Sequence, residues 1–421
     1  MRRRFAAAIA AVLSVKLGAG QAAKSIHYWC RKSMCGISGI VQFDGQPIDT
    51  EQLSRMNDSI IHRGPDGEGQ YVDDGVGLAH RRLAILDLRH EGDQPMHFKD
   101  RLVIVYNGEV YNYIELREEL VTAGYAFSTT TDTEVILAAY DHWGEQCVQR
   151  FNGMWGFAIY DLQSKKLFCS RDRFGIKPFY YCHTAGGIRF GSEIKQLIGD
   201  KPKANQDLVI EYLVSGILDH SQETMFDGVL KILPGHNLFI DVACKSVEAR
   251  QYYEVQANPT IDAMNQSAAV QLVQQTFEQS IRYRLRADVK VGTCLSGGID
   301  SSSVASCAAM QLRQTNPKGR FAAITAIATE PKYDESAYAK AIVDKQDLDW
   351  STVTPTSDDF RQSIDEVVYT QEEPFGGPSI FMQYFVMQEA KTRGCKVMLD
   401  GQGGDETLLG YQKYYPAAYY A

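Results

Sequence analysis

Two different patterns of apolar and polar positions divide the chain. From Cys35 to about Glu193, short alternating or wholly apolar runs are separated by turn sequences such as Asp44-Gly45, which is typical of strands. The strands predicted from these runs are Ile37–Phe43, Leu102–Tyr106, Phe157–Tyr160, Leu167–Ser170, Phe179–Tyr181 and Ile188–Gly191. Apolar spacing predicts two helices, Tyr113–Ala123 and Thr133–Trp143. We therefore expect an α+β domain built on sheets.

From Ile261 onward, predicted strands and helices alternate. The strands are Asp288–Leu295, Phe321–Thr329, Ser351–Thr354 and Lys396–Leu399, and the helices are Asp300–Gln314, Glu335–Gln346, Asp358–Thr370 and Ser379–Arg393. This alternation predicts a parallel sheet with helices on both faces, and such sheets bind ligands at the carboxyl ends of their strands. The intervening residues 201–260 hold a predicted helix, Leu208–Ser215, and a predicted strand, Asn237–Val242, and are interpreted as a connector.

Composition narrows the class of protein. The chain has 421 residues, of which 44% are hydrophobic and 23% charged, as in ordinary globular proteins of two or three domains. The formal net charge is −9, which argues against broad binding of nucleic acid. The nine cysteines include no close CxxC pair, so neither a disulfide framework nor a zinc ribbon is expected. A reduced, cytoplasmic protein is the simplest interpretation.

The first residues differ from the rest. Residues 1–33 carry seven basic side chains and no acidic one. The apolar run Phe5–Val15 is eleven residues long, short of the roughly 20 that span a membrane, so no membrane segment is expected. A signal peptide, a transit peptide and a true start at Met34 each fit this composition. We favour the start at Met34 and treat residues 1–34 as an N-terminal extension.

A glycine-rich string follows one predicted buried strand and opens a helix. It reads Ser296-Gly297-Gly298-Ile299-Asp300-Ser301-Ser302. Glycines allow close approach of the backbone to a ligand, and a helix N-terminus attracts phosphate. A carboxylate there would hold a divalent cation. A tight turn with Ser and Asp caps is the structural alternative. The string is neither a Walker loop nor a dinucleotide fingerprint; it resembles the pyrophosphate loop of ATP pyrophosphatases.

A second glycine-rich loop follows the last predicted strand. It reads Asp400-Gly401-Gln402-Gly403-Gly404-Asp405-Glu406. Asp405 would share a Mg²⁺ ion with Asp300, because hard carboxylate oxygens suit that ion. On its own, this loop fits a structural turn equally well.

The residues after Met34 suggest a second kind of chemistry. Met34-Cys35-Gly36-Ile37-Ser38-Gly39-Ile40 resembles the start of class II glutamine amidotransferases, which remove the initiator Met and use the exposed Cys. A free Cys is otherwise as often a small buried hydrophobe. The family's other motifs follow in order: Ile61 to Asp66 (IHRGPD), His80 to Asp87 (HRRLAILD), Asn107 to Asn112 (NGEVYN), Thr131 to Glu134 (TDTE), Arg171 to Pro178 (RDRFGIKP) and Ser192 to Lys195 (SEIK).

This resemblance implies a role for each matching residue. Cys35 would attack the glutamine amide, with its own α-amino group, of pKa near 8, as general base. The Asn107 side chain and the Gly108 N–H would form the oxyanion hole. Arg82 would pair with the substrate carboxylate, Leu83, Ala84, Ile85 and Leu86 would line the pocket, and Glu109 and Asp132 would receive the α-ammonium group.

The two halves together resemble glutamine-hydrolysing asparagine synthetases. The resemblance implies an α+β N-terminal-nucleophile hydrolase sandwich over residues 35–200. An α/β doubly wound parallel-sheet domain of the ATP pyrophosphatase type would follow over residues 261–421. It also implies that glutamine-derived ammonia amidates aspartate through an acyl-adenylate, with ATP and Mg²⁺, in a possible homodimer. The ATP site would comprise Leu295, Ser296, Gly297, Gly298, Asp300, Ser301, Ile327, Asp400 and Gly401.

Three departures from the family pattern leave alternatives open. Residues 1–33 precede a nucleophile that must be N-terminal. Gln402 replaces a glutamate of the better-studied synthetases, and an amide cannot act as a base at pH 7. The chain ends at Ala421, so we expect a C-terminally truncated synthetase half. Besides asparagine synthesis, amidation of another carboxylate acceptor and glutamine hydrolysis alone remain possible readings.

Overall fold

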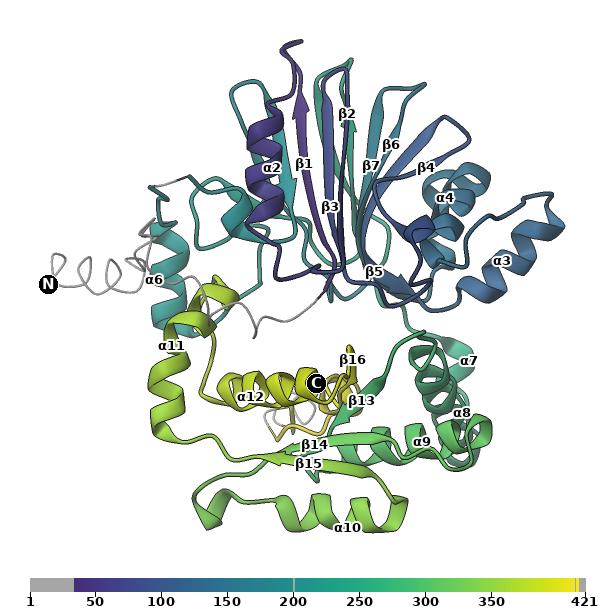
Figure 1. The fold of residues 1–421 in the computed structure, drawn as a ribbon, viewed down its shortest axis with the longest axis vertical. Coiled ribbons are helices and arrows are strands. Elements are labelled where there is room, and N and C mark those ends of the chain that lie inside the picture. Colours follow the sequence, from purple (N-terminus) through teal and green to yellow (C-terminus); the bar gives the residue numbers. More distant parts are fainter. Residues whose placement is uncertain (1–33, 200, 413, 416–421) are drawn as a thin grey trace, which may run out of the picture. The chain divides into compact units, whose positions relative to one another are not determined.

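The computed structural model describes residues 34–199, 201–412, 414 and 415, and these form two compact units. The first unit comprises the described residues up to Gln256 together with Val368–Gly376. The second comprises Ala257–Val367 and the residues from Gly377 onward. Of the expected N-terminal extension, residues 1–34, all but Met34 lie outside the described part of the chain. Figure 1 labels many of the elements of each unit.

The first unit is built on two antiparallel six-stranded sheets. One has the order β10-β8-β9-β1-β3-β2 and the other β12-β11-β7-β6-β5-β4. The strands of the first sheet are β1 (Gly36–Gln42), β2 (Gly67–Asp73), β3 (Val76–Arg82), β8 (Tyr180–His183), β9 (Gly187–Gly191) and β10 (Val229–Lys231). Those of the second are β4 (Met96–Phe98), β5 (Leu102–Val110), β6 (Gly153–Asp161), β7 (Lys166–Arg171), β11 (His236–Asp241) and β12 (Ser246–Gln251).

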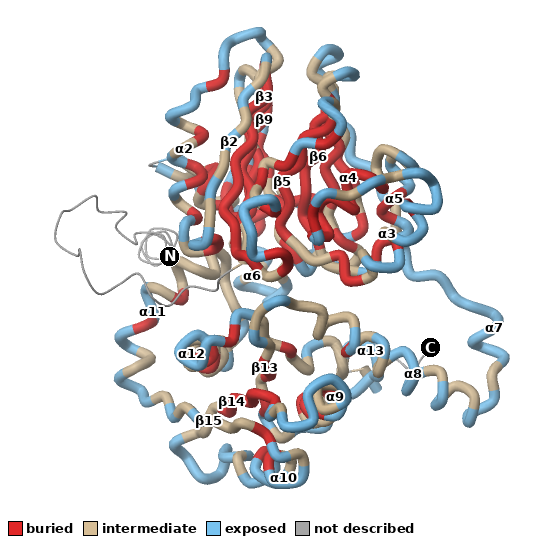
Figure 2. Tube along the Cα trace, turned by 45° about the vertical axis from the view of Figure 1, so that its right-hand side comes forward, coloured by how far each residue is buried: buried red, intermediate tan, exposed pale blue. Residues whose placement is uncertain are grey.

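Strand alternation places one face of each sheet against the other sheet and one face against helices. In β5, Val103 and Val105 enter the core between the sheets, whereas Ile104 and Tyr106 pack with the helix α4 (Asp132–Trp143). Helix α3 (Tyr113–Thr122) joins this second core. Helix α2 (Thr50–Asp58) covers the other sheet. The unit is therefore a sandwich of helix, sheet, sheet and helix, with its most buried backbone in the strands (Figure 2).

Shorter elements complete the first unit. They are η1 (His90–Gly92), η2 (Gly144–Gln146), α5 (Cys147–Arg150), η3 (Ile194–Gln196) and α6 (Gln206–Ser215). The structure differs here from the expected connector at 201–260, because β10 extends the first sheet while β11 and β12 extend the second. Residues up to Gln256 thus complete the two-sheet unit instead of linking it to the next.

The second unit contains a parallel four-stranded sheet with the order β15-β14-β13-β16. Its strands are β13 (Val291–Cys294), β14 (Ala322–Ala326), β15 (Asp349–Val353) and β16 (Val397–Leu399), and its helices are α7 (Pro259–Asp262), α8 (Gln266–Arg284), α9 (Ile299–Thr315), η4 (Pro331–Tyr333), α10 (Ser336–Gln346), α11 (Ser357–Gln371), α12 (Ser379–Thr392) and α13 (Gly404–Leu408). Helices α9 and α10 share one buried cluster with the sheet and α12 shares another. The predicted parallel sheet flanked by helices is confirmed.

A candidate glutaminase site and a candidate nucleotide loop

Cys35 lies at the start of β1, where two strands bring two sequence motifs together. In the antiparallel β1–β3 ladder, Gly36 is opposite Arg81. Cys35 is therefore next to the residues that follow β3. The Leu83 N–H donates to Cys35 Sγ at 3.3 Å, and the thiol contacts the Leu83 carbonyl at 3.5 Å. The thiol is thus fixed against the first residues of the loop after β3.

A small pocket opens beside this thiol. Of the residues expected at the glutamine site, Arg82, Leu83, Ile85, Leu86, Gly108, Glu109 and Asp132 line it together with Cys35. The remaining two support the site from outside this lining. Ala84 donates its N–H to Asp66 Oδ2 at 2.9 Å. Asn107 lies against the carbonyl of Cys35.

The backbone of Cys35 is held by a chain of buried charged and polar groups. Arg63 donates from Nε to the Cys35 carbonyl at 2.9 Å and from Nη1 to Glu193 Oε1 at 3.0 Å. With its amide oriented to satisfy both neighbours, Asn107 donates to the Cys35 carbonyl at 3.0 Å and accepts from Arg63 Nη2 at 3.2 Å. Although burial opposes ionisation of Glu193, the adjacent His62 and Arg63 hold the pKa of its carboxyl well below the usual range.

In the second unit, both glycine-rich strings lie at the carboxyl ends of neighbouring parallel strands. The Leu295–Ser301 segment follows β13, and Asp400-Gly401 follows β16. A Cβ on Gly401 would lie 2.8 Å from the Ser301 nitrogen, and one on Gly404 would lie 2.4 Å from an Asp300 carboxylate oxygen. The two loops are therefore in direct contact, and a side chain at position 401 would press on the backbone of Ser301.

Comparisons with known proteins cover both units. Residues 34–253 match the family model for a glutamine amidotransferase domain, and residues 272–421 match the model for asparagine synthase. Over 405 residues the chain is 36% identical to the putative glutamine-hydrolyzing asparagine synthetase 2 of Methanocaldococcus jannaschii, an alignment that covers 90% of this chain and 76% of that protein.

The chain belongs to the glutamine-hydrolysing asparagine synthetase family. It is also 33% identical over 392 residues to asparagine synthetase 1 of Bacillus subtilis strain 168 and 30% identical over 410 residues to a Penicillium rubens protein named amidase chyE. Each alignment covers 90% of this chain, but only 59% and 60% of those two relatives. The chain therefore spans about three fifths of their length.

In this member of the family, burial strongly affects the ionisable groups at the pocket. Desolvation raises the pKa of the Cys35 thiol to about 11, and the charge of Glu109 adds to the effect. The Leu83 backbone, Lys177 and Arg63 oppose it. Burial lowers the pKa of Lys177 to about 8. The thiol therefore needs a base, or a change in its surroundings, to act as a nucleophile at neutral pH.

Asp132 is the buried acid of the pocket. Its Oδ2 accepts from the Tyr106 hydroxyl and from the Val110 N–H, both at 2.8 Å. Desolvation nevertheless raises the pKa of its carboxyl to about 6, because these bonds compensate only part of the lost hydration. A ligand cation beside Asp132 would restore the charged form.

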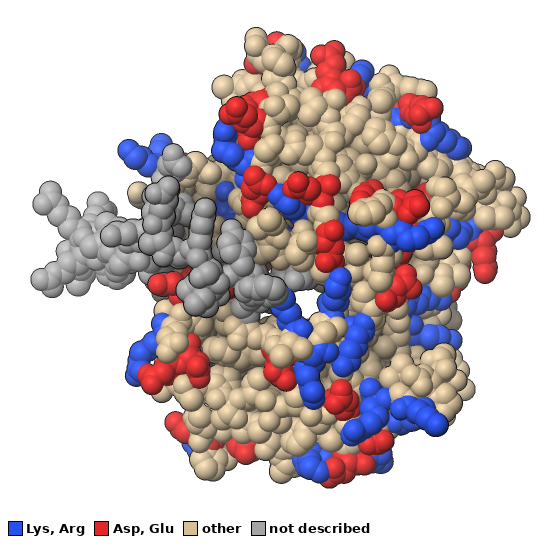
Figure 3. Space-filling view, in the orientation of Figure 1, with Lys and Arg blue, Asp and Glu red and all other residues tan. Residues whose placement is uncertain are grey.

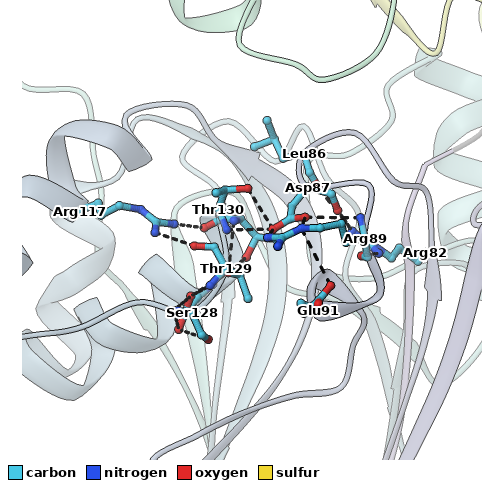
Figure 4. Close-up of polar contacts among 11 residues, drawn as sticks. Arg82, Leu86, Asp87, Arg89, Glu91, Arg117, Ser128, Thr129 and Thr130 are labelled. Atoms are coloured by element: carbon cyan, nitrogen blue, oxygen red, sulfur yellow. Dashed lines mark hydrogen bonds and ion pairs between the residues drawn. The ribbon is translucent and has the colours of Figure 1, made fainter.

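Arg82 is held by its own loop. Its Nη1 donates to the Arg89 carbonyl and to Asp93 Oδ1, both at 2.7 Å, and its Nη2 donates to the carbonyls of Leu86 and Asp87. Figure 4 shows how these groups lie. The family member thus presents Arg82 at the edge of the pocket, while much of the guanidinium is already bonded within the loop.

Several pocket residues were not predicted from the sequence. These are Gly92, Gln94, Tyr106, Thr131 and Thr133. Gln94 accepts from the Tyr106 N–H at 2.7 Å and donates to Thr133 Oγ1 at 3.3 Å. In the sequence, the only sign that Gln94 belongs to the pocket was its position between two motifs. A single Gln before a Pro does not by itself indicate a site.

Within the described residues, no helix has both the length and the apolar character needed to cross a membrane. On the face of the first unit drawn in Figure 3, basic and acidic side chains are interspersed. In the part of the chain that the structure describes, no group of three or more His, Cys, Asp or Glu side chains has an arrangement suited to a metal ion.

Proposed function

We propose that the first unit hydrolyses glutamine with Cys35 as nucleophile. The observation that carries this proposal is that a single pocket collects the thiol, Gly108, Arg82, Glu109 and Asp132. These groups match the parts of glutamine. Its amide carbon needs a nucleophile, its α-carboxylate needs a cation, and its α-ammonium group needs an anionic carboxylate.

In this proposal, Cys35 Sγ attacks the amide carbon and forms a glutamyl thioester with release of ammonia. The Asn107 amide and the Gly108 N–H stabilise the oxyanion. Asp132 and Glu109 hold the α-ammonium group, Arg82 pairs with the α-carboxylate, and Leu83, Ile85 and Leu86 line the pocket. The general base is the α-amino group of Cys35, which requires that Met34 has been removed.

We further propose that the second unit binds ATP and activates aspartate for attack by ammonia. The reversal of strand order around β13, with β14 on one side and β16 on the other, supports a doubly wound sheet with its ligand site at that point. Leu295 to Gly298, Asp300, Ser301, Ile327, Asp400 and Gly401 would hold the nucleotide. Ile327 follows β14, at the same edge of the sheet.

The residues at this edge also suit Mg²⁺, because the Asp300 carboxylate adjoins the loop that carries Asp405, and carboxylates are preferred ligands of this ion. When bound, Mg²⁺ would neutralise phosphate charge.

Glutamine, ATP and reduced thiols are all present in the cytoplasm, and the eight described cysteines form no disulfide among themselves. Both facts support the expected cytoplasmic location.

The test is the product formed from aspartate, ATP, Mg²⁺ and glutamine labelled with ¹⁵N in its amide. We expect labelled asparagine, AMP and pyrophosphate. Glutamate release without any asparagine would contradict asparagine synthesis by this chain.

A second candidate is amidation of a different carboxylate. Gln402 favours it, since this amide cannot serve as a base near the acceptor, and a relative at 30% identity is named an amidase. Glutamine-dependent formation of AMP that requires a carboxylate other than aspartate would support this candidate. Glutaminase activity without ATP–pyrophosphate exchange would instead leave glutamine hydrolysis as the sole activity.

A further inference from the structure

Asp87 is a fully buried acid that lies behind the pocket and is absent from its lining. Only 1% of its side chain is exposed. Its carboxylate accepts from Arg89 Nε at 2.7 Å and Nη2 at 2.6 Å, and from the Thr130 N–H at 2.9 Å and Oγ1 at 3.0 Å. Figure 4 shows the carboxylate between Arg89 and Thr130, which belong to two different loops.

The first of these loops forms the wall of the pocket that contains Arg82. Because the guanidinium of Arg82 donates to the carbonyls of Leu86, Asp87 and Arg89, the course of the loop and the position of Arg82 depend on each other. Asp87 also has a left-handed backbone, with φ of 49°, which a residue with a Cβ adopts only when its surroundings hold it there.

The second loop leads into the part of the pocket wall that contains Asp132, the first residue of helix α4. Glu134 accepts from the N–H and hydroxyl groups of Ser128 and Thr129. Arg117 donates to the carbonyls of Thr129 at 2.7 Å and Thr131 at 2.9 Å. These bonds make residues 128–131 rigid, and Thr130 is the position at which this rigid turn is attached to Asp87.

We propose that Asp87 is a positioning residue that sets the separation between the two walls, and thereby the selectivity of the pocket for an α-amino acid. One wall offers a cation to the α-carboxylate and the other offers an acid to the α-ammonium group, so their separation must match the substrate. This inference rests on the proposed glutaminase function. Arg89 holds the pKa of the Asp87 carboxyl well below its usual range, which agrees with a permanently charged link.

The test compares Asp87→Ala and Asp87→Asn with the wild type. An amide is a poor substitute, because its NH₂ group would face one of the donors that the carboxylate accepts from. We expect the KM for glutamine to rise at least about tenfold while kcat changes less than about threefold, since the lost interaction acts on binding. Asp141→Asn is the matched control: Asp141 is on the same helix as Asp132, bonds Lys99, Arg101 and Tyr125, and is absent from the pocket lining.

Two labels for the thiol separate positioning from general loss of structure. A diazoketone analogue of glutamine carries the α-amino and α-carboxylate groups, whereas iodoacetamide carries neither. In the Asp87 variants we expect labelling of Cys35 by the analogue to slow at least about tenfold and labelling by iodoacetamide to stay within about twofold.

Equal slowing with both labels, or unchanged KM and labelling, would overturn the inference. If the wild type hydrolyses glutamine and the variants match it, only the role of Asp87 is lost. If the wild type neither hydrolyses glutamine nor reacts with the analogue, the proposed function fails and this inference fails with it.

Discussion

At the scale of single residues, the charged groups around the pocket are neutralised by other protein groups instead of by water. Arg63 contacts the Cys35 carbonyl, Asn107 and Glu193 at once. Removing one such partner would leave the others buried and unpaired, which costs more than the bond itself contributes. The motif residues are therefore coupled, and their effects on activity are expected to be non-additive.

Asp132 should control the acid side of the pH profile. Because burial raises the pKa of its carboxyl to about 6, the carboxylate is present above that pH and is lost as the pH falls through it. We expect kcat/KM for glutamine to decrease below about pH 6. Asp132→Asn should lower kcat/KM roughly 10- to 100-fold, as for loss of a charge-assisted bond, and should remove this limb. Steady-state rates from pH 5 to 9 provide the check, and an unchanged limb in the variant would argue against the assignment.

Lys177 should influence the thiol through its charge. It is one of the groups that lower the pKa of Cys35. The ammonium of Lys177, whose pKa is about 8, is mostly charged at pH 7. Lys177→Met should therefore raise the pKa of Cys35 further and slow alkylation by iodoacetamide at pH 7 by about three- to tenfold, equivalent to roughly 0.5 to 1 pKa unit. Lys166→Met is the control, since its ammonium is exposed and pairs with Asp241. Equal rates in the two variants would contradict an electrostatic role for Lys177.

At the scale of elements, close approach of backbones determines both candidate sites. Only glycine fits at Gly108, where a Cβ would lie 2.2 Å from the Met154 carbonyl oxygen, and at Gly401 beside Ser301. In each case a loop or strand is pressed against its neighbour, so the side chains on both can reach a shared ligand.

Gly401→Ala should impair ATP–pyrophosphate exchange without impairing glutamine hydrolysis. The added Cβ would displace the Asp300–Ser301 backbone, so we expect ATP–pyrophosphate exchange to fall at least about tenfold while glutamine hydrolysis is retained. Gly377→Ala is the control, because no atom lies within 4 Å of its added Cβ. Exchange at the wild-type rate in Gly401→Ala would show that this loop does not border the nucleotide.

Most elements were predictable because their pattern is local. The four strands of the second unit and its helices α9 to α12 were predicted to within a few residues, since apolar runs alternate there with helical spacing, whereas helix α8 was not predicted. Strands β2 and β3 were missed: Gly67–Asp73 has no apolar run, and Val76–Arg82 is buried throughout although it ends in His80, Arg81 and Arg82. Arg81 is buried because Asn57 and Asp58, which are distant in sequence, accept its hydrogen bonds, and a local pattern cannot show such partners.

The candidate site was predictable only as a set of motifs. Cys35, Arg82, Gly108 and Asp132 were named from the sequence and share one pocket. The roles of Gln94 and Thr130 depend on contacts across 39 and 43 positions. Nothing in the sequence signals such contacts.

At the scale of the whole molecule, the boundaries between units do not follow the order of the chain. Val368–Gly376 belongs to the first unit although it joins helices of the second. Its Glu372 accepts from the N–H groups of Ile194 at 2.8 Å and Lys195 at 2.7 Å. A division of the sequence into consecutive domains cannot represent such a segment.

The proposed chemistry also requires a particular N-terminal residue in the active protein. Because the proposed general base is the α-amino group of Cys35, we expect active protein to begin at Cys35. Intact mass and N-terminal sequencing of the active fraction should both give this residue. Retention of residues 24–33 on fully active protein would contradict the proposed base.

The most direct test of the central claim is glutamate release from glutamine by the wild type and by Cys35→Ala. The thiol is the only proposed nucleophile, so we predict that the wild type releases glutamate and ammonia in equal amounts, and that the variant is at least about a thousandfold slower although still folded. Glutamate release by Cys35→Ala at a rate close to that of the wild type would contradict the account.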